Sequence, residues 1–182
     1  TYLFAKGRHY EIYEKMGAHL AEEDGKAGTY FSVWAPNARS VSVVGDFNNW
    51  DRTAHPMQPV QQSGIWDIFV PGVKAGDLYK FAVETSQGYT VLKADPYGNQ
   101  SQLRPDNASV VADIRYFDWT DQAWRKAHQE KKTESPMAIY EVHPGSWKKD
   151  PSMPGEFYNF KKLAVELADY VLEMGYTHVE LI

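Results

Sequence analysis

The stretch GDFNNWD, residues 45–51, places a tryptophan in a segment that otherwise has the composition of a turn. Turns usually carry small polar residues such as Asn48 and Asn49, so Trp50 needs an explanation. An exposed indole matches the apolar C–H face of a glucose ring in size, and neighbouring amide or cationic side chains can then bind the hydroxyl groups. The pattern therefore predicts that Trp50 stacks on a sugar.

A second candidate chemistry is glycoside cleavage, which needs two carboxyl groups about 5–5.5 Å apart. Glu141 and Glu180 lie in two strand-like runs near the end of the sequence, and neighbouring strands are about 4.8 Å apart. Two strands do not form a closed cleft, so we interpret both glutamates as structural carboxylates that pair with Lys or Arg. His143 and Trp147 follow the first of these runs, and we expect them to pack within their loop, with contact to a sugar chain as the alternative.

The composition of the chain excludes several classes of protein. Its 182 residues, 43% of them hydrophobic, suffice for one globular domain with a proper core. The net charge is −5 and basic residues do not cluster, so a nucleic-acid partner is disfavoured. No run approaches the roughly 20 apolar residues of a membrane span. There is no cysteine for a disulfide or a thiolate metal site. We expect a cytoplasmic protein without a membrane or nucleic-acid partner.

Short runs rich in β-branched and aromatic residues, each bounded by turn residues, dominate the first part of the chain. They are residues 28–36, 40–45, 65–70, 78–84, 89–94 and 108–113. Runs of this length and spacing predict a mainly β fold, an immunoglobulin-like antiparallel β-sandwich. We expect Trp34 and Trp66, which alternate with other apolar residues, to lie in its core.

The periodicity changes after the predicted sandwich. Residues 119–132 favour a helix with Thr120 as its N-cap. Residues 137–142 are typical of a strand buried on both faces, residues 159–174 carry the apolar stripe of a helix, and residues 177–182 begin another buried strand. This order predicts a β-α-β unit with parallel strands.

We therefore expect an N-terminal extension at 1–20, the sandwich at 21–116, a connecting helix and linker at 117–136, and the β-α-β unit at 137–182. Two parallel strands with one helix cannot cover both faces of their sheet, so the chain is predicted to be part of a longer protein. Its uncovered apolar surface also predicts self-association through residues 137–182. We expect that interface to be centred on Ile139, Leu167, Val171, Val179 and Leu181.

Five stretches, in this order, carry a resemblance to a known family: GTYFSVWAPNARSVSVVGDFNNWD, SGIWDIFVPGVKAGDLYKFAV, KADPYG, AIYEVHPGSW and LADYVLEMGYTHVELI. With them the chain resembles the N-terminal part of α-1,4-glucan (glycogen) branching enzymes. The resemblance implies a carbohydrate-binding module of family 48, followed by the first strand, helix and second strand of an α-amylase-type (β/α)₈ barrel. Pro144 departs from the family, in which Leu is frequent at this position.

The resemblance also implies a glucan-binding site in the sandwich. The matching positions are Trp50, Lys80, Tyr89, Leu103 and Asn107. The family's nucleophilic Asp, acid Glu and stabilising Asp lie on later barrel strands, so the resemblance implies no catalytic residue in this chain. It implies no metal and no cofactor either. The expected partners are α-glucans: glycogen, amylose and maltooligosaccharides.

By the same resemblance, the longer protein would cleave an α-1,4-glucan and transfer the chain to a glucose 6-hydroxyl, forming α-1,6 branches. This chain would bind or position glucan and brace the barrel. Two alternatives stay open: a non-catalytic glucan-binding module, and part of a debranching or trehalose-releasing relative. If the module serves only as a brace, Trp50 packs against the N-terminal segment or the barrel and Lys80 is an ordinary solvated residue.

Overall fold

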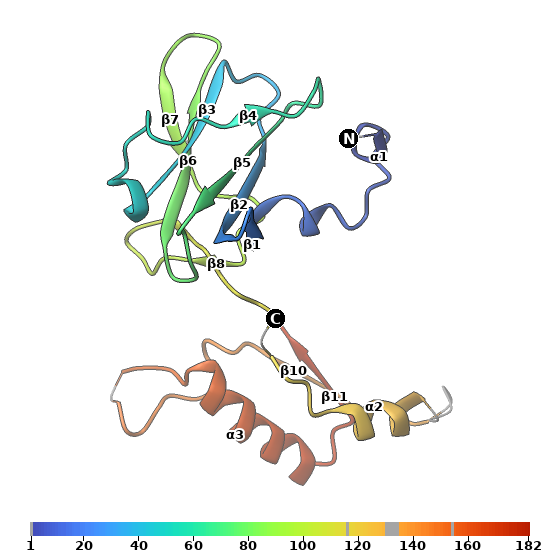
Figure 1. The fold of residues 1–182 in the computed structure, drawn as a ribbon. Coiled ribbons are helices and arrows are strands. Elements are labelled where there is room, and N and C mark those ends of the chain that lie inside the picture. Colours follow the sequence, from blue (N-terminus) through green and yellow to red (C-terminus); the bar gives the residue numbers. More distant parts are fainter. Residues whose placement is uncertain (1, 116, 130–134, 154) are drawn as a thin grey trace. The chain divides into compact units, whose positions relative to one another are not determined.

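The computed structural model describes residues 2–115, 117–129, 135–153 and 155–182 (Figure 1). The chain divides into two compact units, Thr1–Asp118 and Trp119–Ile182. The first unit is built from β-strands, and the second combines helices with a parallel pair of strands.

The first sheet of the first unit is antiparallel and has the order β1-β2-β5-β4. Its strands are β1 (Gly17–Glu23), β2 (Lys26–Trp34), β5 (Ile65–Pro71) and β4 (Gln58–Pro59). In the ladder between β2 and β5, Ser32 is paired with Asp67 and Trp34 with Ile65. Directly paired residues project from the same face of an antiparallel sheet, so Ser32, Trp34 and Asp67 share a face.

The second sheet is also antiparallel and has the order β3-β6-β9-β8, with β7 paired to β6 as well (Figure 1). Its strands are β3 (Ser40–Gly45), β6 (Leu78–Glu84), β9 (Ser109–Val110), β8 (Gln100–Ser101) and β7 (Thr90–Lys93). In the β3–β6 ladder, Val44 is paired with Lys80. The ladder ends with the pair of Gly45 and Tyr79, so the GDFNNWD segment leaves the sheet beside the strand that carries Lys80.

The core of the first unit consists of alternate residues from both sheets. Phe31 of β2 meets Tyr79 of β6 with ring centroids 5.0 Å apart, and Tyr79 in turn meets Phe81 at 5.9 Å. The buried cluster comprises Ala18, Phe31, Val33, Val41, Val43, Met57, Val70, Val73, Tyr79, Phe81 and Val111. Burial of such side chains stabilises the fold by about 25 cal/mol per Å² of apolar surface. The predicted antiparallel sandwich is thereby confirmed.

The N-terminal segment differs from the expectation of an extension up to residue 20. It holds the short helix α1 (Tyr2–Ala5) and the 3-10 helix η1 (Ile12–Glu14), and strand β1 already begins at Gly17. The sequence did not reveal β1 because only Gly17 and Ala18 are buried and the strand ends in two exposed glutamates. The pattern of alternating apolar residues that marks the other strands is therefore too short here.

Of the two tryptophans assigned to the core, one was assigned wrongly. The Trp34 side chain is 55% exposed, because Phe31 and Val33 occupy the core face of β2 and alternation turns Trp34 outward. Trp66 packs against the core, and its indole N–H donates to the carbonyl of Ala35 at 3.1 Å. Both faces of β2 carry aromatic residues, so the sequence pattern alone did not distinguish them.

The second unit contains the predicted β-α-β order. Strands β10 (Ile139–Val142) and β11 (His178–Leu181) pair in parallel, and helix α3 (Phe160–Glu173) connects them. The Asn159 side chain caps α3 by accepting a hydrogen bond from the backbone N–H of Lys162 at 3.0 Å. Helix α2 (Gln122–Gln129) precedes β10.

Helix α2 begins two residues after the predicted cap. Since α2 starts at Gln122, the residue before it is Asp121, and Thr120 lies outside the helix. Asp121 is equally suited by residue type to cap a helix, so the sequence could not choose between them. The predicted helix also extended to residue 132, and its last residues lie outside the described part of the chain.

The five residues predicted for self-association do not form one surface. Leu167 is buried with Val142 in a small core, and Val171 packs against it. Side chains alternate along β10, so Ile139 projects from the face opposite to Val142, whose partner in β11 is Leu181. The remaining exposed apolar residues thus divide between the two faces of the strand pair. Among the described residues, no helix has the length and apolar character that a membrane crossing requires.

Candidate functional site

The GDFNNWD segment forms a compact turn at the end of β3. The 3-10 helix η2 (Asp46–Asn48) follows Gly45, and then Asn49 and Trp50 both adopt positive φ angles, 52° and 60°. Asparagine tolerates this left-handed region, but a tryptophan there costs about 1–2 kcal/mol relative to ordinary backbone geometry. The surrounding contacts must therefore hold Trp50 in place.

Two hydrogen bonds fix Trp50. Its backbone N–H donates to the carbonyl of Gly45 at 2.9 Å, and its indole Nε1–H donates to Oδ1 of Asp46 at 3.0 Å. The side chain remains partly exposed. The sequence analysis assigned no role to Asp46. Its position four residues before Trp50, in the same turn, is the one feature that could have indicated this contact. The arrangement presents an indole ring whose polar edge is already bonded and whose faces can be used for stacking.

The other residues of the segment have structural roles. A Cβ at Gly45 would collide with the carbonyl oxygen of Leu78, so β3 and β6 can approach only with glycine there. Phe47 packs against Phe31 of the core, with ring centroids 5.9 Å apart. Asn48 accepts from the backbone N–H of Gly45 at 2.9 Å and donates to the carbonyl of Val43 at 3.0 Å. Its amide therefore stabilises the turn.

Lys80 and Asn107 are in direct contact. The ammonium of Lys80 donates to Oδ1 of Asn107 over 2.5 Å. Because Tyr79 and Phe81 face the core, alternation turns Lys80 to the outer face of the second sheet, the face of its partner Val44. Val44 immediately precedes the glycine to which Trp50 is bonded, so Lys80 lies on the strand adjacent to the Trp50 turn.

Leu103 and Tyr89 lie at two different places relative to this pair. Leu103 is 88% exposed and belongs to the loop between β8 and β9, the loop that also carries Asn107. Tyr89 is 55% exposed at the turn between β6 and β7, where its carbonyl accepts from the N–H of Thr85. Thr85 is five residues from Lys80, about 17 Å along an extended strand. One glucose ring cannot contact both Lys80 and Tyr89, whereas a chain of several glucose units can.

The buried Tyr79 and the partly buried Asp95 fix the segment that leads into the Asn107 loop. The hydroxyl of Tyr79 donates to Oδ2 of Asp95 at 2.5 Å, and the backbone N–H of Asp95 donates to Oγ of Ser109 at 2.9 Å. Burial raises the pKa of Tyr79, and the charge of Asp95 raises it further. Burial also raises the pKa of Asp95, against the opposing effect of the Tyr79 hydrogen bond. Through these two bonds Asp95, the first residue of the DPYG turn, is joined to Tyr79 of β6 and to Ser109 of β9. The chain before and after the loop that carries Asn107 is thereby held in place.

The two glutamates of the second unit lie side by side on neighbouring strands. Glu141 and Glu180 are direct register partners in the parallel ladder, and both side chains are exposed. Chemistry on a glycosidic bond takes place where water is excluded, which this surface does not provide. The Trp147 indole donates to the hydroxyl of Tyr140 at 3.0 Å and its ring meets Tyr170 edge-on. Trp147 therefore packs within its own unit.

His143 also has a local partner, because its Nδ1 lies 3.0 Å from Oγ of Ser146 in the turn that begins at Pro144. Across the described residues, no three His, Cys, Asp or Glu side chains gather in a way that could hold a metal ion.

Comparison with known proteins defines the first unit. Residues 15–98 match the family Carbohydrate-binding module 48 (Isoamylase N-terminal domain). That match includes Trp50, Lys80 and Tyr89 and ends before Leu103 and Asn107. The class of protein is therefore one that contains a carbohydrate-binding module in an immunoglobulin-like sandwich.

The whole chain has close relatives. It is 52% identical over all 182 residues to the 1,4-alpha-glucan branching enzyme GlgB of Protochlamydia amoebophila, of which it spans 25%. It is 49% identical, again over its full length, to the corresponding enzyme of Marinobacter nauticus, of which it spans 28%. The chain belongs to the 1,4-alpha-glucan branching enzyme family and spans about a quarter of the length of these relatives.

The fold also occurs in solved structures. The catalytic module of the glycogen-degrading pneumococcal virulence factor SpuA aligns over 91% of this chain and 26% of its own, with a TM-score of 0.67 and 25% identity. This alignment covers most of both units, so the succession of a sandwich and a β-α-β unit is common to the two proteins.

Proposed function

We propose that the chain is the α-glucan-binding part of a 1,4-α-glucan branching enzyme. The observation that carries the proposal is the identity of 52% over the full length of the chain to such an enzyme. Identity at this level extends over both units. It favours branching over a debranching reaction and over an independent binding module.

The proposed glucan site lies on the outer face of the second sheet. Trp50 stacks on the apolar face of a glucose ring, and its bond to Asp46 holds the indole in the stacking orientation. An ammonium group has three donors, and Lys80 uses one of them for Asn107. The amide nitrogen of Asn107 and the remaining donors of Lys80 are then available to glucose hydroxyls. Leu103 and Tyr89 contact glucose units further along the same chain.

In the longer protein we propose cleavage of an α-1,4 linkage and transfer of the chain to a glucose 6-hydroxyl. Retention of configuration requires a nucleophilic carboxylate and an acid/base about 5–5.5 Å apart. The exposed pair Glu141 and Glu180 does not supply them, so the chemistry takes place on other strands of the enzyme. The substrates are glycogen, amylose and maltooligosaccharides, and the reaction needs no cofactor. We assign the protein to the cytoplasm, to which a chain without cysteine is suited.

We further propose that the 182-residue chain self-associates through its second unit. Val179 and Leu181 are 41% and 64% exposed, and β11 pairs only with β10 in the described part of the chain. An unpaired strand edge beside exposed apolar side chains is a template for another copy. Pairing between two copies covers both the edge and these side chains.

The glucan site is tested by calorimetry with maltoheptaose. Stacking and a few hydrogen bonds from an open surface give a dissociation constant above about 10 µM. Trp50→Ala should remove most of this affinity. Trp124→Ala is the matched control, because Trp124 is also exposed but belongs to the second unit, and it should bind as the parent chain does. Equal binding by Trp50→Ala and the parent chain would place the site elsewhere.

A further inference from the structure

The outer face of the first sheet has the composition of a binding surface. Tyr30, Ser32 and Trp34 alternate along β2 on the side away from the core. Asp67 is the register partner of Ser32 and His19 is that of Tyr30, so both extend the same face. A face that combines aromatic rings with hydroxyl, imidazole and carboxylate groups suits a ligand that is partly apolar and partly polar.

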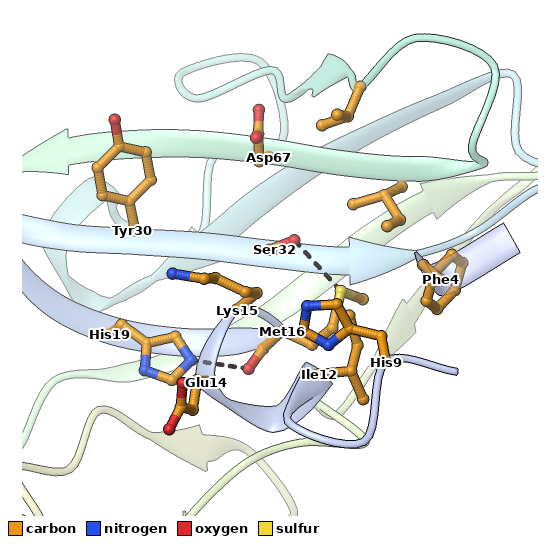
Figure 2. Close-up of a pocket in the computed structure, with 12 residues that line it drawn as sticks. Phe4, His9, Ile12, Glu14, Lys15, Met16, His19, Tyr30, Ser32 and Asp67 are labelled. Carbon is orange, nitrogen blue, oxygen red and sulfur yellow. Dashed lines mark hydrogen bonds between the residues drawn. The ribbon is translucent and has the colours of Figure 1, made fainter. Parts of the chain in front are cut away.

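The N-terminal segment forms a wall beside this face. Met16 is buried, and the hydroxyl of Ser32 donates to its sulfur at 3.4 Å. Phe4 meets the Trp34 ring edge-on, with centroids 6.1 Å apart. Between this segment and strands β2 and β5 lies a pocket of about 440 Å³, within the range of small-molecule sites. Figure 2 shows Asp67 and Tyr30 on the strands and His9, Lys15 and Phe4 on the N-terminal segment.

The pocket contains polar groups whose hydrogen-bonding capacity is unused. Nδ1 of His9 is buried and has no partner among the described residues. Asp67 is partly buried, which raises the pKa of its carboxyl group, and no side chain or backbone N–H in the described ranges donates to it. Buried polar atoms in native proteins are nearly always paired, so the unpaired Nδ1 of His9 indicates that another group bonds to it. The partly exposed carboxylate of Asp67 lines the same pocket and can accept further hydrogen bonds.

The charges of the pocket exclude some ligands. Glu14 and Asp67 outnumber Lys15, so an anion would meet a net repulsion. The lining does not contain a group of three ligating side chains suited to a metal ion, in keeping with the result for all the described residues. A neutral ligand with several hydroxyl groups and an apolar face satisfies the carboxylate and the imidazole and can also contact Phe4.

We propose that this pocket is a second α-glucan site, which takes a chain end or short segment of neutral glucose units. The inference rests on the proposed function and extends it to the opposite sheet. Asp67 and His9 bond to hydroxyl groups, and Phe4 contacts the apolar face of the same ring. Trp34, exposed next to Phe4, stacks on a neighbouring glucose unit outside the pocket.

The experiment is a titration of the isotope-labelled 182-residue chain with maltotriose, followed by amide NMR shifts. We expect saturable shifts at Tyr30, Ser32 and Asp67 that persist in Trp50→Ala, since the two sites lie on different sheets.

Asp67→Asn should weaken the affinity measured at these amides by about tenfold or more, because a charged acceptor is lost. Asp24→Asn removes the same charge from the β1–β2 turn of the same sheet and should leave the affinity unchanged. Trp34→Ala should weaken it by several-fold, and Trp124→Ala should not.

The outcomes separate this inference from the proposed function. Shifts confined to Lys80, Asn107 and the Trp50 turn would leave the proposed function intact and overturn the second site. Shifts on the first sheet that are insensitive to both Asp67→Asn and Trp34→Ala would also overturn it. A chain without shifts on either sheet would contradict both proposals.

Discussion

The ammonium of Lys80 donates a hydrogen bond to Oδ1 of Asn107 over 2.5 Å, joining two residues that are 27 positions apart in the sequence. Lys80 comes from the middle of a ladder strand, whereas Asn107 comes from a loop between two short strands. Their contact makes one polar group out of a strand residue and a loop residue next to the Trp50 turn. If this group binds glucose hydroxyls, the two side chains should act as a unit.

The first prediction tests this coupling. Lys80→Ala and Asn107→Ala should each weaken maltoheptaose binding by about fivefold, the effect of one lost hydrogen bond. The double variant should be little worse than either single variant, because each partner orients the other. Calorimetry on the four proteins of the cycle measures the coupling. Additive losses would show that the two residues bind the glucan independently.

The second prediction concerns stability and its pH dependence. Tyr79→Phe removes the hydroxyl that donates to Asp95 and leaves a partly buried carboxylate with one donor fewer, which should cost about 1–3 kcal/mol near neutral pH. Burial already raises the folded-state pKa of Asp95 above the pKa in the unfolded chain. Between these two pKa values the folded state binds more protons, so the free energy of unfolding falls as the pH rises. The substitution removes a bond that lowers this pKa, so the folded pKa rises further.

The cost of Tyr79→Phe should therefore shrink as the pH is lowered and Asp95 takes up a proton. Urea unfolding of the parent chain and of Tyr79→Phe at about pH 7 and about pH 4 measures this difference in the free energy of unfolding. Tyr30→Phe is the control, because its hydroxyl donates to the exposed Glu23 and its loss should change stability little at either pH. A cost for Tyr79→Phe that stays constant with pH would mean that Asp95 is not the group affected.

The third prediction is that the 182-residue chain does not cleave or branch amylose. Glu141 and Glu180 are neighbours in the ladder but stand on an open surface. Iodine staining of amylose should therefore be unchanged by the chain. Loss of colour that Glu141→Gln or Glu180→Gln abolishes would assign the pair a catalytic role after all.

The fourth prediction concerns association. Sedimentation at micromolar concentration should show a dimer or larger assembly of residues 1–182. Val179→Lys with Leu181→Lys should favour the monomer, since charge beside a strand edge opposes pairing. Val165→Lys is the matched control, because Val165 is exposed on α3 and faces away from its buried stripe. A chain ending near Glu134 should also be monomeric. A monodisperse monomer for the whole chain would refute association.

The sequence by itself determined the family, the sandwich and the β-α-β order. Hydrophobic alternation of period two marks strands directly, as in the runs that became β3, β5 and β6, because burial on one face acts on every second residue. The turn GDFNNWD and the lysine of YKF could likewise be selected as candidates by residue type and resemblance. For Trp50, Lys80, Tyr89, Leu103 and Asn107, binding to glucan remains a prediction.

Only the tertiary structure decided which residues meet. Alternation does not tell which face of a strand carrying aromatics on both sides is inside, and this is why Trp34 was assigned to the core although it is exposed. The pocket beside it depends on where the N-terminal segment lies, which local sequence does not specify. Of the five predicted association residues, Leu167 and Val171 pack in a small core. The register places Leu181 beside Val142 on one face of the strand pair, and Ile139 lies on the opposite face. Register and chain path are set by contacts between distant segments, and a single sequence contains no direct record of them.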